Sequence, residues 1–184
     1  MPISTSRTRF CKACPDDHGV KILGVDPGLG ITGYAVISVP EVLREDAQIK
    51  LLEAGIIHTG RAASGIGARL RKVHDSLAEL IEELAPDVLV IEKLFTHYKQ
   101  PTTAILMGHV RGVVCLLSGT KKIPLVSMPS THVKKAVTGR GHAKKEQVQR
   151  MIQHILRLKR MPEPPDVADA LAIAIAYAYN RKTQ

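Results

Sequence analysis

Four acidic residues stand among apolar neighbours in the sequence. Asp26 ends the run Lys21-Ile-Leu-Gly-Val-Asp26, and Glu92 follows four consecutive apolar residues. Asp166 and Asp169 are the only acids in a segment that otherwise reads Val-Ala-Ala-Leu-Ala-Ile-Ala-Ile-Ala. Residues three apart in a helix project from the same face, and an unpaired carboxylate within an apolar helix is costly. These four acids are therefore the candidates for chemistry.

Taken singly, the acids also have ordinary structural interpretations. Asp26-Pro-Gly is a common turn sequence, Asp166 follows two prolines as a helix cap does, and Glu92 can mark the solvent end of a strand. Brought together, the four would repel one another and raise some of their pKa values unless a cation intervened. Oxygen ligands in this number suit Mg²⁺ or Mn²⁺ better than zinc, and two such ions about 4 Å apart promote phosphodiester hydrolysis.

The positive charge of the chain is concentrated in one segment. The sequence has 26 Lys and Arg against 17 Asp and Glu, a formal charge of +9, and residues 134–160 alone contribute +8. Such a segment suits a polyanion, because each phosphate contact releases counterions; the alternative is a solvated basic helix face. Beside an acidic centre, it predicts a nuclease with DNA-binding candidates Lys134, Lys135, Arg140, Lys144, Lys145 and Arg150.

Two further motifs suggest sites that we reject. Gly28-Leu-Gly-Ile-Thr-Gly33 matches the dinucleotide-binding pattern, but that pattern must open a helix, and a strand-like run to Pro40 follows here. We interpret these glycines as turn formers in a hairpin. Cys11-Lys-Ala-Cys14 with His18 resembles half of a zinc site, but no second pair follows. Residues 1–20 are therefore expected to be a flexible extension.

The elements that position the acids follow from hydrophobic periodicity. Short β-rich runs predict strands at 21–26, 32–39 and 50–59, joined as an antiparallel meander. Runs at 87–92 and 123–128 predict two further, parallel strands. The fold class is therefore α/β, a five-stranded mixed sheet with helices on its faces. Helical periodicity predicts these helices at 64–84, 102–118, 131–138, 144–159 and 166–179.

Length and composition limit the remaining possibilities. A chain of 184 residues allows one well-cored domain, which we place at residues 21–181, and 45% apolar residues exclude a disordered chain. No uninterrupted apolar run approaches the ~18 residues of a membrane helix, and there is no signal-peptide core. Three cysteines are too few for a disulfide framework. We expect a soluble, cytoplasmic protein that contacts no membrane.

Four blocks of sequence occur in a fixed order between residues 21 and 180. They are Lys21-Ile-Leu-Gly-Val-Asp-Pro-Gly with Thr32-Gly-Tyr34, Val90-Ile-Glu92 with Phe95, Val133-Lys-Lys-Ala-Val-Thr-Gly139-x-Gly141-x-Ala143-x-Lys145-x-Gln147-Val, and Asp166-Val-Ala-Asp169-Ala-Leu-Ala-Ile-Ala. Together these blocks resemble the RuvC family of crossover junction endodeoxyribonucleases. The resemblance implies a ribonuclease-H-like fold, a homodimer, and Mg²⁺-dependent symmetric nicking of Holliday junctions, which are four-way DNA junctions, in recombination and DNA repair.

The resemblance also implies roles for single residues. The family's acids matching Asp26, Glu92, Asp166 and Asp169 bind two metal ions, and Mn²⁺ can substitute for Mg²⁺. Lysines matching Lys134 and Lys145 support DNA binding or catalysis, although the adjacent Lys135 is an alternative to Lys134. The aromatic matching Phe95 stacks on an unpaired base near the crossover; an ordinary core ring is the alternative. Helix 102–118 would help form the dimer, and the family also works with a branch-migration helicase.

The resulting hypothesis is a structure-selective endonuclease that uses water as the nucleophile and leaves a 5′ phosphate. Lys93 stands where many family members have Gln, so the family's cleavage-site preference is not transferred to this chain. One alternative is a catalytically inactive junction-binding protein, and another is a ribonuclease-H-like nuclease acting on a different nucleic acid. A sugar-kinase or actin-like ATPase also begins with Asp-x-Gly, but it needs a second half for which 184 residues leave no room.

Overall fold

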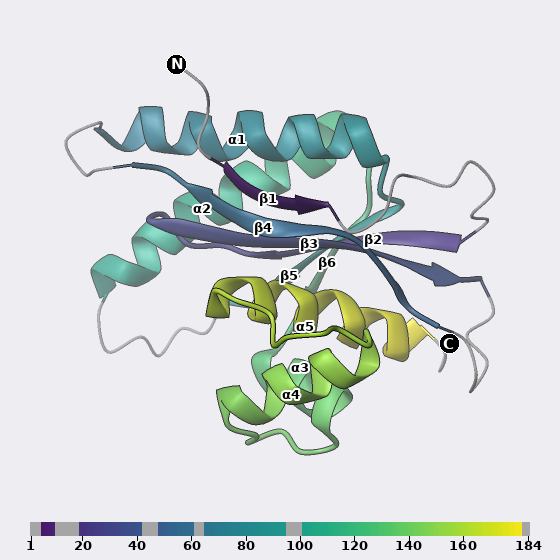
Figure 1. Cartoon of the computed structure of the whole chain (residues 1–184). Coiled ribbons are helices and arrows are strands. Elements are labelled where there is room, and N and C mark those ends of the chain that lie inside the picture. Colours follow the sequence, from purple (N-terminus) through teal and green to yellow (C-terminus); the bar gives the residue numbers. More distant parts are fainter. Residues whose placement is uncertain (1–4, 10–18, 42–47, 61–64, 95–100, 182–184) are drawn as a thin grey trace.

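A mixed β-sheet between two layers of helices forms the protein (Figure 1). The computed structural model describes residues 5–9, 19–41, 48–60, 65–94 and 101–181. Cys11, Cys14, His18 and Phe95 therefore lie outside the described residues. The strands pair in the order β1-β4-β3-β2-β5-β6. Their bounds are β1 Thr5–Arg9, β2 Gly19–Asp26, β3 Ile31–Pro40, β4 Lys50–His58, β5 Val88–Glu92 and β6 Leu125–Met128.

The five predicted strands are confirmed, with the predicted directions. Strands β2, β3 and β4 form an antiparallel meander, β5 runs parallel to β2, and β6 runs parallel to β5. The predicted number of strands is wrong by one, because Thr5–Arg9 of the N-terminal extension pairs with β4. A meander that ended at β4 would leave a row of unpaired backbone groups, and β1 covers them.

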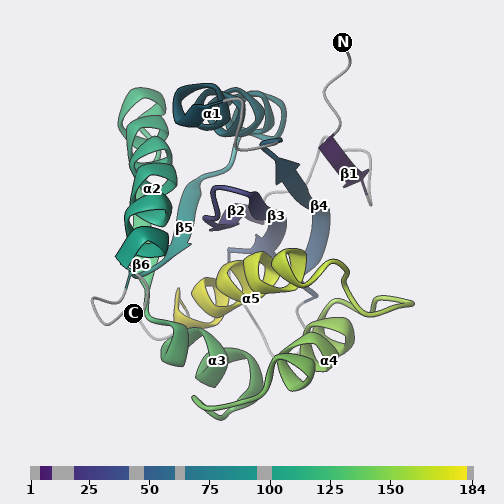
Figure 2. The same ribbon diagram turned by 90° about the vertical axis from the view of Figure 1, so that its left-hand side faces the viewer.

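The helices lie in two layers, with α1 and α2 over one face of the sheet and α3, α4 and α5 over the other (Figure 2). All five predicted helices are present, although two of them end elsewhere. The second continues to Lys121, past the expected stop at Gly119, and the fourth ends at Ile155, before Arg157 adopts a positive φ of 51°. Their bounds are α1 Gly65–Leu84, α2 Pro101–Lys121, α3 Ser130–Thr138, α4 Lys145–Ile155 and α5 Pro165–Asn180.

Two hydrophobic clusters hold these layers to the sheet. Successive residues of β2 serve both, because a strand points its side chains alternately to either face: Ile22 packs in the cluster with α5, and Leu23 packs in the cluster with α1 and α2. Helix α5 approaches the sheet very closely at two glycines. A Cβ at Gly24 would collide with the Ala170 carbonyl oxygen, and a Cβ at Gly33 would collide with that of Asp166. Because Gly24 and Gly33 have no Cβ, the first turns of α5 can lie directly on β2 and β3.

Candidate active site

The four candidate acids lie at the end of the sheet to which β2 and β5 point. Asp26 is the last residue of β2 and Glu92 is the last residue of β5, and the register of these parallel neighbours places both at the same edge. Asp166 and Asp169 lie in the first two turns of α5, whose start is held on the sheet by Gly33. Two strand ends and one helix start therefore converge, and the sequence-predicted acids come with them.

The electrostatics of Asp26 show how close the four acids are. Burial raises the pKa of Asp26 to about 7, and the negative charges of Asp169, Glu92 and Asp166, in that order, add to the effect. Lys145 opposes the rise. The other three acids are thus near enough to destabilise the charge of Asp26, and one lysine partly compensates.

Glu92 experiences a similar but milder environment. Burial is the main cause that raises its pKa, and the Ser130 hydroxyl, which donates a hydrogen bond to the carboxylate, opposes the rise. Asp169 raises the pKa of Glu92 further, whereas Lys134 and Lys145 lower it. Ser130 begins α3, so this helix brings both a hydrogen-bond donor and Lys134 to the acids.

Lys145 is the basic residue in direct contact with the acids. Its Nζ donates to Asp169 Oδ2 over 3.0 Å, and this bond is the main reason that the pKa of Lys145 is raised. Of the two adjacent lysines that the sequence left as alternatives, Lys134 lines a small cavity beside Glu92, Asp169 and Lys145. The cavity measures about 50 Å³. At ~30 Å³ per water molecule, this space accommodates one or two waters.

The donor set fits a divalent cation in chemistry and in charge. Carboxylate oxygens are the ligands that Mg²⁺ and Mn²⁺ prefer, and the raised pKa values of Asp26 and Glu92 are those of acids that lack sufficient compensating charge. Within the described part of the chain, however, no group of three or more Asp, Glu, His or Cys is arranged as a finished metal site. Asp26, Glu92, Asp166 and Asp169 are the residues that would hold an ion here.

Two arginines that the sequence analysis did not single out hold the strand ends in place. Arg111 of α2 donates from Nη1 to the Glu92 carbonyl oxygen over 2.8 Å and from Nη2 to Ser127 Oγ over 2.7 Å. Arg69 of α1 donates from Nη2 to the carbonyl oxygen of Leu29, in the turn that follows Asp26, over 3.0 Å. A charged residue in an otherwise apolar helix was the available sequence signal for Arg111.

The remaining basic candidates lie on α3, on α4 and in the loop between these helices. Arg140 lies in the loop between α3 and α4, which begins at Gly139 with a φ of 76°. Lys144 immediately precedes α4, and Arg150 lies within it. These three side chains and that of Lys135 are exposed. They are thus accessible to an anionic ligand.

Comparisons with known proteins agree with this architecture. A family model described as crossover junction endodeoxyribonuclease RuvC matches residues 22–177. The chain is 46% identical over 158 residues to the RuvC of Rhodopirellula baltica, covering 86% of this chain and 85% of that protein. It is 42% identical over 166 residues to the RuvC of Thermomicrobium roseum, covering 90% and 97%.

A solved structure extends the comparison to three dimensions. The structure of T. thermophilus RuvC in complex with a Holliday junction substrate superposes with a TM-score of 0.81 at 28% sequence identity, covering 89% of this chain and 96% of that chain. The family model, the two sequence relatives and this solved structure all match nearly the whole domain. The protein therefore belongs to the RuvC family of crossover junction endodeoxyribonucleases.

Proposed function

We propose that this protein resolves Holliday junctions by symmetric hydrolysis of DNA strands near the crossover, in recombination and repair. The observation that carries the proposal is the convergence of Asp26, Glu92, Asp166 and Asp169 beside a basic surface, in a chain of the RuvC family. Its relative from T. thermophilus was solved with a Holliday junction bound. The acids supply the hydrolytic centre, and the basic surface supplies the attraction for DNA that the acids alone would repel.

The proposed cofactor is a divalent metal ion, which membership of this family implies. We infer Mg²⁺, two ions per site with Mn²⁺ able to substitute, held by the four acids. Bound metal supplies an activated water and stabilises the leaving oxygen. Asp26 and Glu92, which burial and mutual repulsion destabilise as anions, would gain the countercharge that they lack in the free protein.

The proposed roles of the basic residues differ between those that line the cavity beside the acids and those that do not. Lys134 and Lys145 line the cavity beside Glu92 and Asp169, so they would contact the phosphate at the cleavage site. The exposed Lys135, Arg140, Lys144 and Arg150 lie farther along the same segment and would hold the DNA backbone on either side of it. The stacking role of Phe95 stays a prediction, because this residue lies outside the described part of the chain.

The proposed assembly is a homodimer formed through α2. Residues 102–121 of this helix are long and apolar enough to cross a membrane by length and composition, yet only 17% of the window is buried. One side packs on the domain through Val110 and Val114, and Arg111 reaches the ends of β5 and β6, so α2 is held as part of the helical layer. The opposite side exposes Ile105 and Leu116, 61% and 58% accessible. A second copy of α2 would cover this stripe.

A cleavage assay tests the proposed function. The protein is offered a four-way junction, a linear duplex and an RNA–DNA hybrid, with Mg²⁺ and with EDTA. We expect metal-dependent cuts in the junction, and we expect the variant Asp26→Asn to bind the junction without cutting it. The control Asp75→Asn, an exposed position on α1, should cut like the wild type.

Other outcomes of this assay would favour the alternatives. Salt-sensitive binding with no cleavage under any divalent ion would indicate an inactive junction-binding protein. Preferential cutting of the hybrid would indicate a nuclease for another nucleic acid. Cutting by Asp26→Asn at the wild-type rate would contradict the role of Asp26. Cooperation with a branch-migration helicase and a cytoplasmic location remain predictions.

A further inference from the structure

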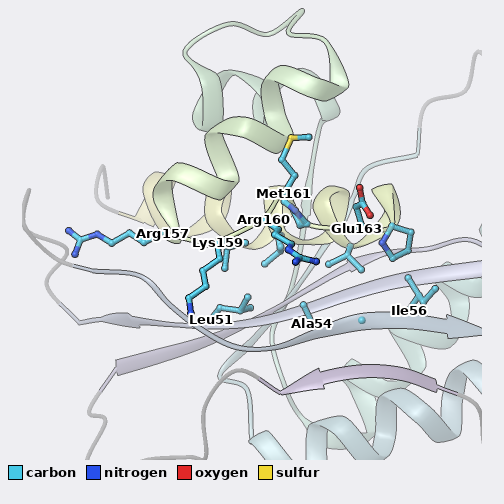
Figure 3. Close-up of a pocket in the computed structure, with 14 residues that line it drawn as sticks. Leu51, Ala54, Ile56, Arg157, Lys159, Arg160, Met161 and Glu163 are labelled. Atoms are coloured by element: carbon cyan, nitrogen blue, oxygen red, sulfur yellow. The ribbon is translucent and has the colours of Figure 1, made fainter.

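A large groove lies on the same face of the sheet as α5 (Figure 3), and none of the four acids lines it. It measures about 1010 Å³ and runs between β4 and the segment that connects α4 to α5. The groove exists because α5 packs mainly on β2 and β3 and leaves β4 largely uncovered. Its lining is Leu51, Ala54, Gly55, Ile56, Arg157, Leu158, Lys159, Arg160, Met161, Pro162, Glu163, Pro164, Val167 and Leu171.

The floor of this groove is apolar. Leu51, Ala54 and Ile56 come from β4, and Val167 and Leu171 come from α5. At ~100° per residue around the helix axis, the mean direction of Val167 and Leu171 lies about 150° from that of Asp166 and Asp169. The groove and the acids therefore occupy opposite flanks of α5, and a molecule in the groove would not have to displace DNA from the acids.

The rim of the groove is basic and unpaired. Lys159 and Arg160 are exposed and extend from the connecting segment toward β4 (Figure 3). Neither side chain makes a hydrogen bond or an ion pair with the described part of the chain. Glu163 is the one acid among the lining residues, and its carboxylate turns away from β4 (Figure 3). Among the described residues, the unpaired charge at the mouth of the groove is thus positive.

These two features together specify the occupant. A DNA backbone would satisfy the rim but would leave the apolar floor unfilled, since a phosphodiester chain carries no apolar side chains to insert. A second copy of this chain is a poor match, because Asp75 and Glu82 on its acidic helix α1 are already paired with Arg71 and Lys121. We propose that the groove binds an acidic peptide segment of a partner protein, with apolar side chains on the floor and carboxylates at Lys159 and Arg160.

Fluorescence anisotropy with three labelled octapeptides tests this proposal on the full-length chain. The first peptide alternates Asp or Glu with Leu or Ile; the second replaces the acids by Asn and Gln; the third replaces the apolar residues by Ser and Thr. We expect the first peptide to bind, and each replacement to weaken binding about tenfold or more, because floor and rim both contribute. The protein variant Lys159→Glu/Arg160→Glu should weaken binding of the first peptide by a similar factor.

The matched control is Arg71→Glu/Lys122→Glu, which changes the net charge equally at exposed positions outside the groove. It should bind the first peptide as the wild type does, and circular dichroism should show both variants folded. Equal weakening by the two variants, equal binding of all three peptides, or no binding at about 1 mM would overturn the proposal. Displacement of the peptide by duplex DNA, or loss of self-association in the Lys159→Glu/Arg160→Glu variant, would assign the groove to DNA or to a second copy and overturn it equally.

Discussion

Asp26 is the residue whose environment is least favourable to its own charge. Its pKa is raised to about 7, chiefly by burial, so the folded protein holds a proton that the unfolded chain releases near pH 4. The protonated Asp26 side chain therefore causes no loss in the free energy of unfolding of the metal-free protein below about pH 4. This free energy falls as the pH rises from about 4 to about 7, because the buried side chain must then carry a charge. A buried acid in this environment thus reduces the stability of the fold at neutral pH unless a cation compensates its charge.

The variant Asp26→Asn should consequently be more stable than the wild type at pH 8 in EDTA. At 1.36 kcal/mol per pKa unit, the gain in the free energy of unfolding is at most about 4 kcal/mol, and it should nearly vanish at pH 4. Urea denaturation at the two pH values measures it. Asp75→Asn is the control with the opposite sign, because His74 and Arg71 lower the pKa of the exposed Asp75. Equal stability of Asp26→Asn and the wild type at pH 8 would contradict the raised pKa.

In the metal-free protein, the positive charge of Lys145 already compensates the carboxylate of Asp169, so the lysine would compete with a metal ion for that carboxylate. Replacing it by Gln removes the 3.0 Å contact and leaves Asp169 free, so metal binding without DNA should tighten. An exposed ion pair contributes up to ~1 kcal/mol, which corresponds to at most about fivefold in the dissociation constant of Mn²⁺, measured by calorimetric titration. Lys144→Gln, next to it, removes the same charge and should change the constant less. Weaker metal binding by Lys145→Gln would show that the lysine supports the site rather than competing for it.

At this scale the sequence predicted the acids better than the residues that orient them. An acid in an apolar strand or helix conflicts with its neighbours, and this conflict is visible in the sequence. Arg111 and Ser130 act on Glu92 from distant elements, through its carbonyl oxygen and its carboxylate. Arg111 is a charge in a mostly apolar helix, but neither residue type indicates which partner it contacts. Their roles depend on the register between elements, which periodicity does not supply.

At the scale of elements, the site depends on how closely α5 lies on the sheet. Gly33→Ala would place a methyl group against the Asp166 carbonyl and push the start of α5 outward. We expect a loss of about 1–3 kcal/mol in the free energy of unfolding, as for other overpacked cores, and at least about a tenfold lower rate of junction cleavage at saturating junction. Gly67→Ala, on α1 with nothing within 4 Å, should instead gain about 0.5–1 kcal/mol and leave the rate unchanged. Equal effects of the two substitutions would exclude the close approach as the cause.

Helices and strands were predictable from the sequence where one face of the element is buried and therefore apolar. They were not predictable where only backbone pairing with a distant strand defines the element. The periodicity of α1 and the apolar run of β5 define those elements locally, and both appear where expected. Strand β1 was not predicted, because Thr-Ser-Arg-Thr-Arg has no apolar face; its pairing with β4 is what makes it a strand. Helix α4 also ends earlier than predicted, close to Arg157, which has a positive φ. An arginine in the sequence does not indicate this backbone conformation.

At the scale of the whole molecule, the charge of +9 separates into parts with different roles. Lys134 and Lys145 line the cavity beside Glu92 and Asp169, and Arg140, Lys144 and Arg150 are exposed before and on α4. Lys159 and Arg160 line the separate groove beside β4. One continuous basic segment in the sequence thus serves two surfaces in the fold.

The exposed stripe on α2 predicts the assembly of the whole molecule. Ile105 and Leu116 lie on the side that faces away from the sheet, and leaving such side chains in water is unfavourable. Leu116→Glu should therefore convert the dimer to a monomer in sedimentation analysis at about 10 μM, because two carboxylates would meet across the symmetric interface. Met151→Glu is the matched control, since Met151 is also an exposed apolar residue, 37% accessible, but lies on α4. A Met151→Glu protein that stays dimeric beside a monomeric Leu116→Glu protein would support the α2 interface. A wild-type monomer, or a Leu116→Glu dimer, would refute it, and the two active sites of a symmetric cut would then need another arrangement.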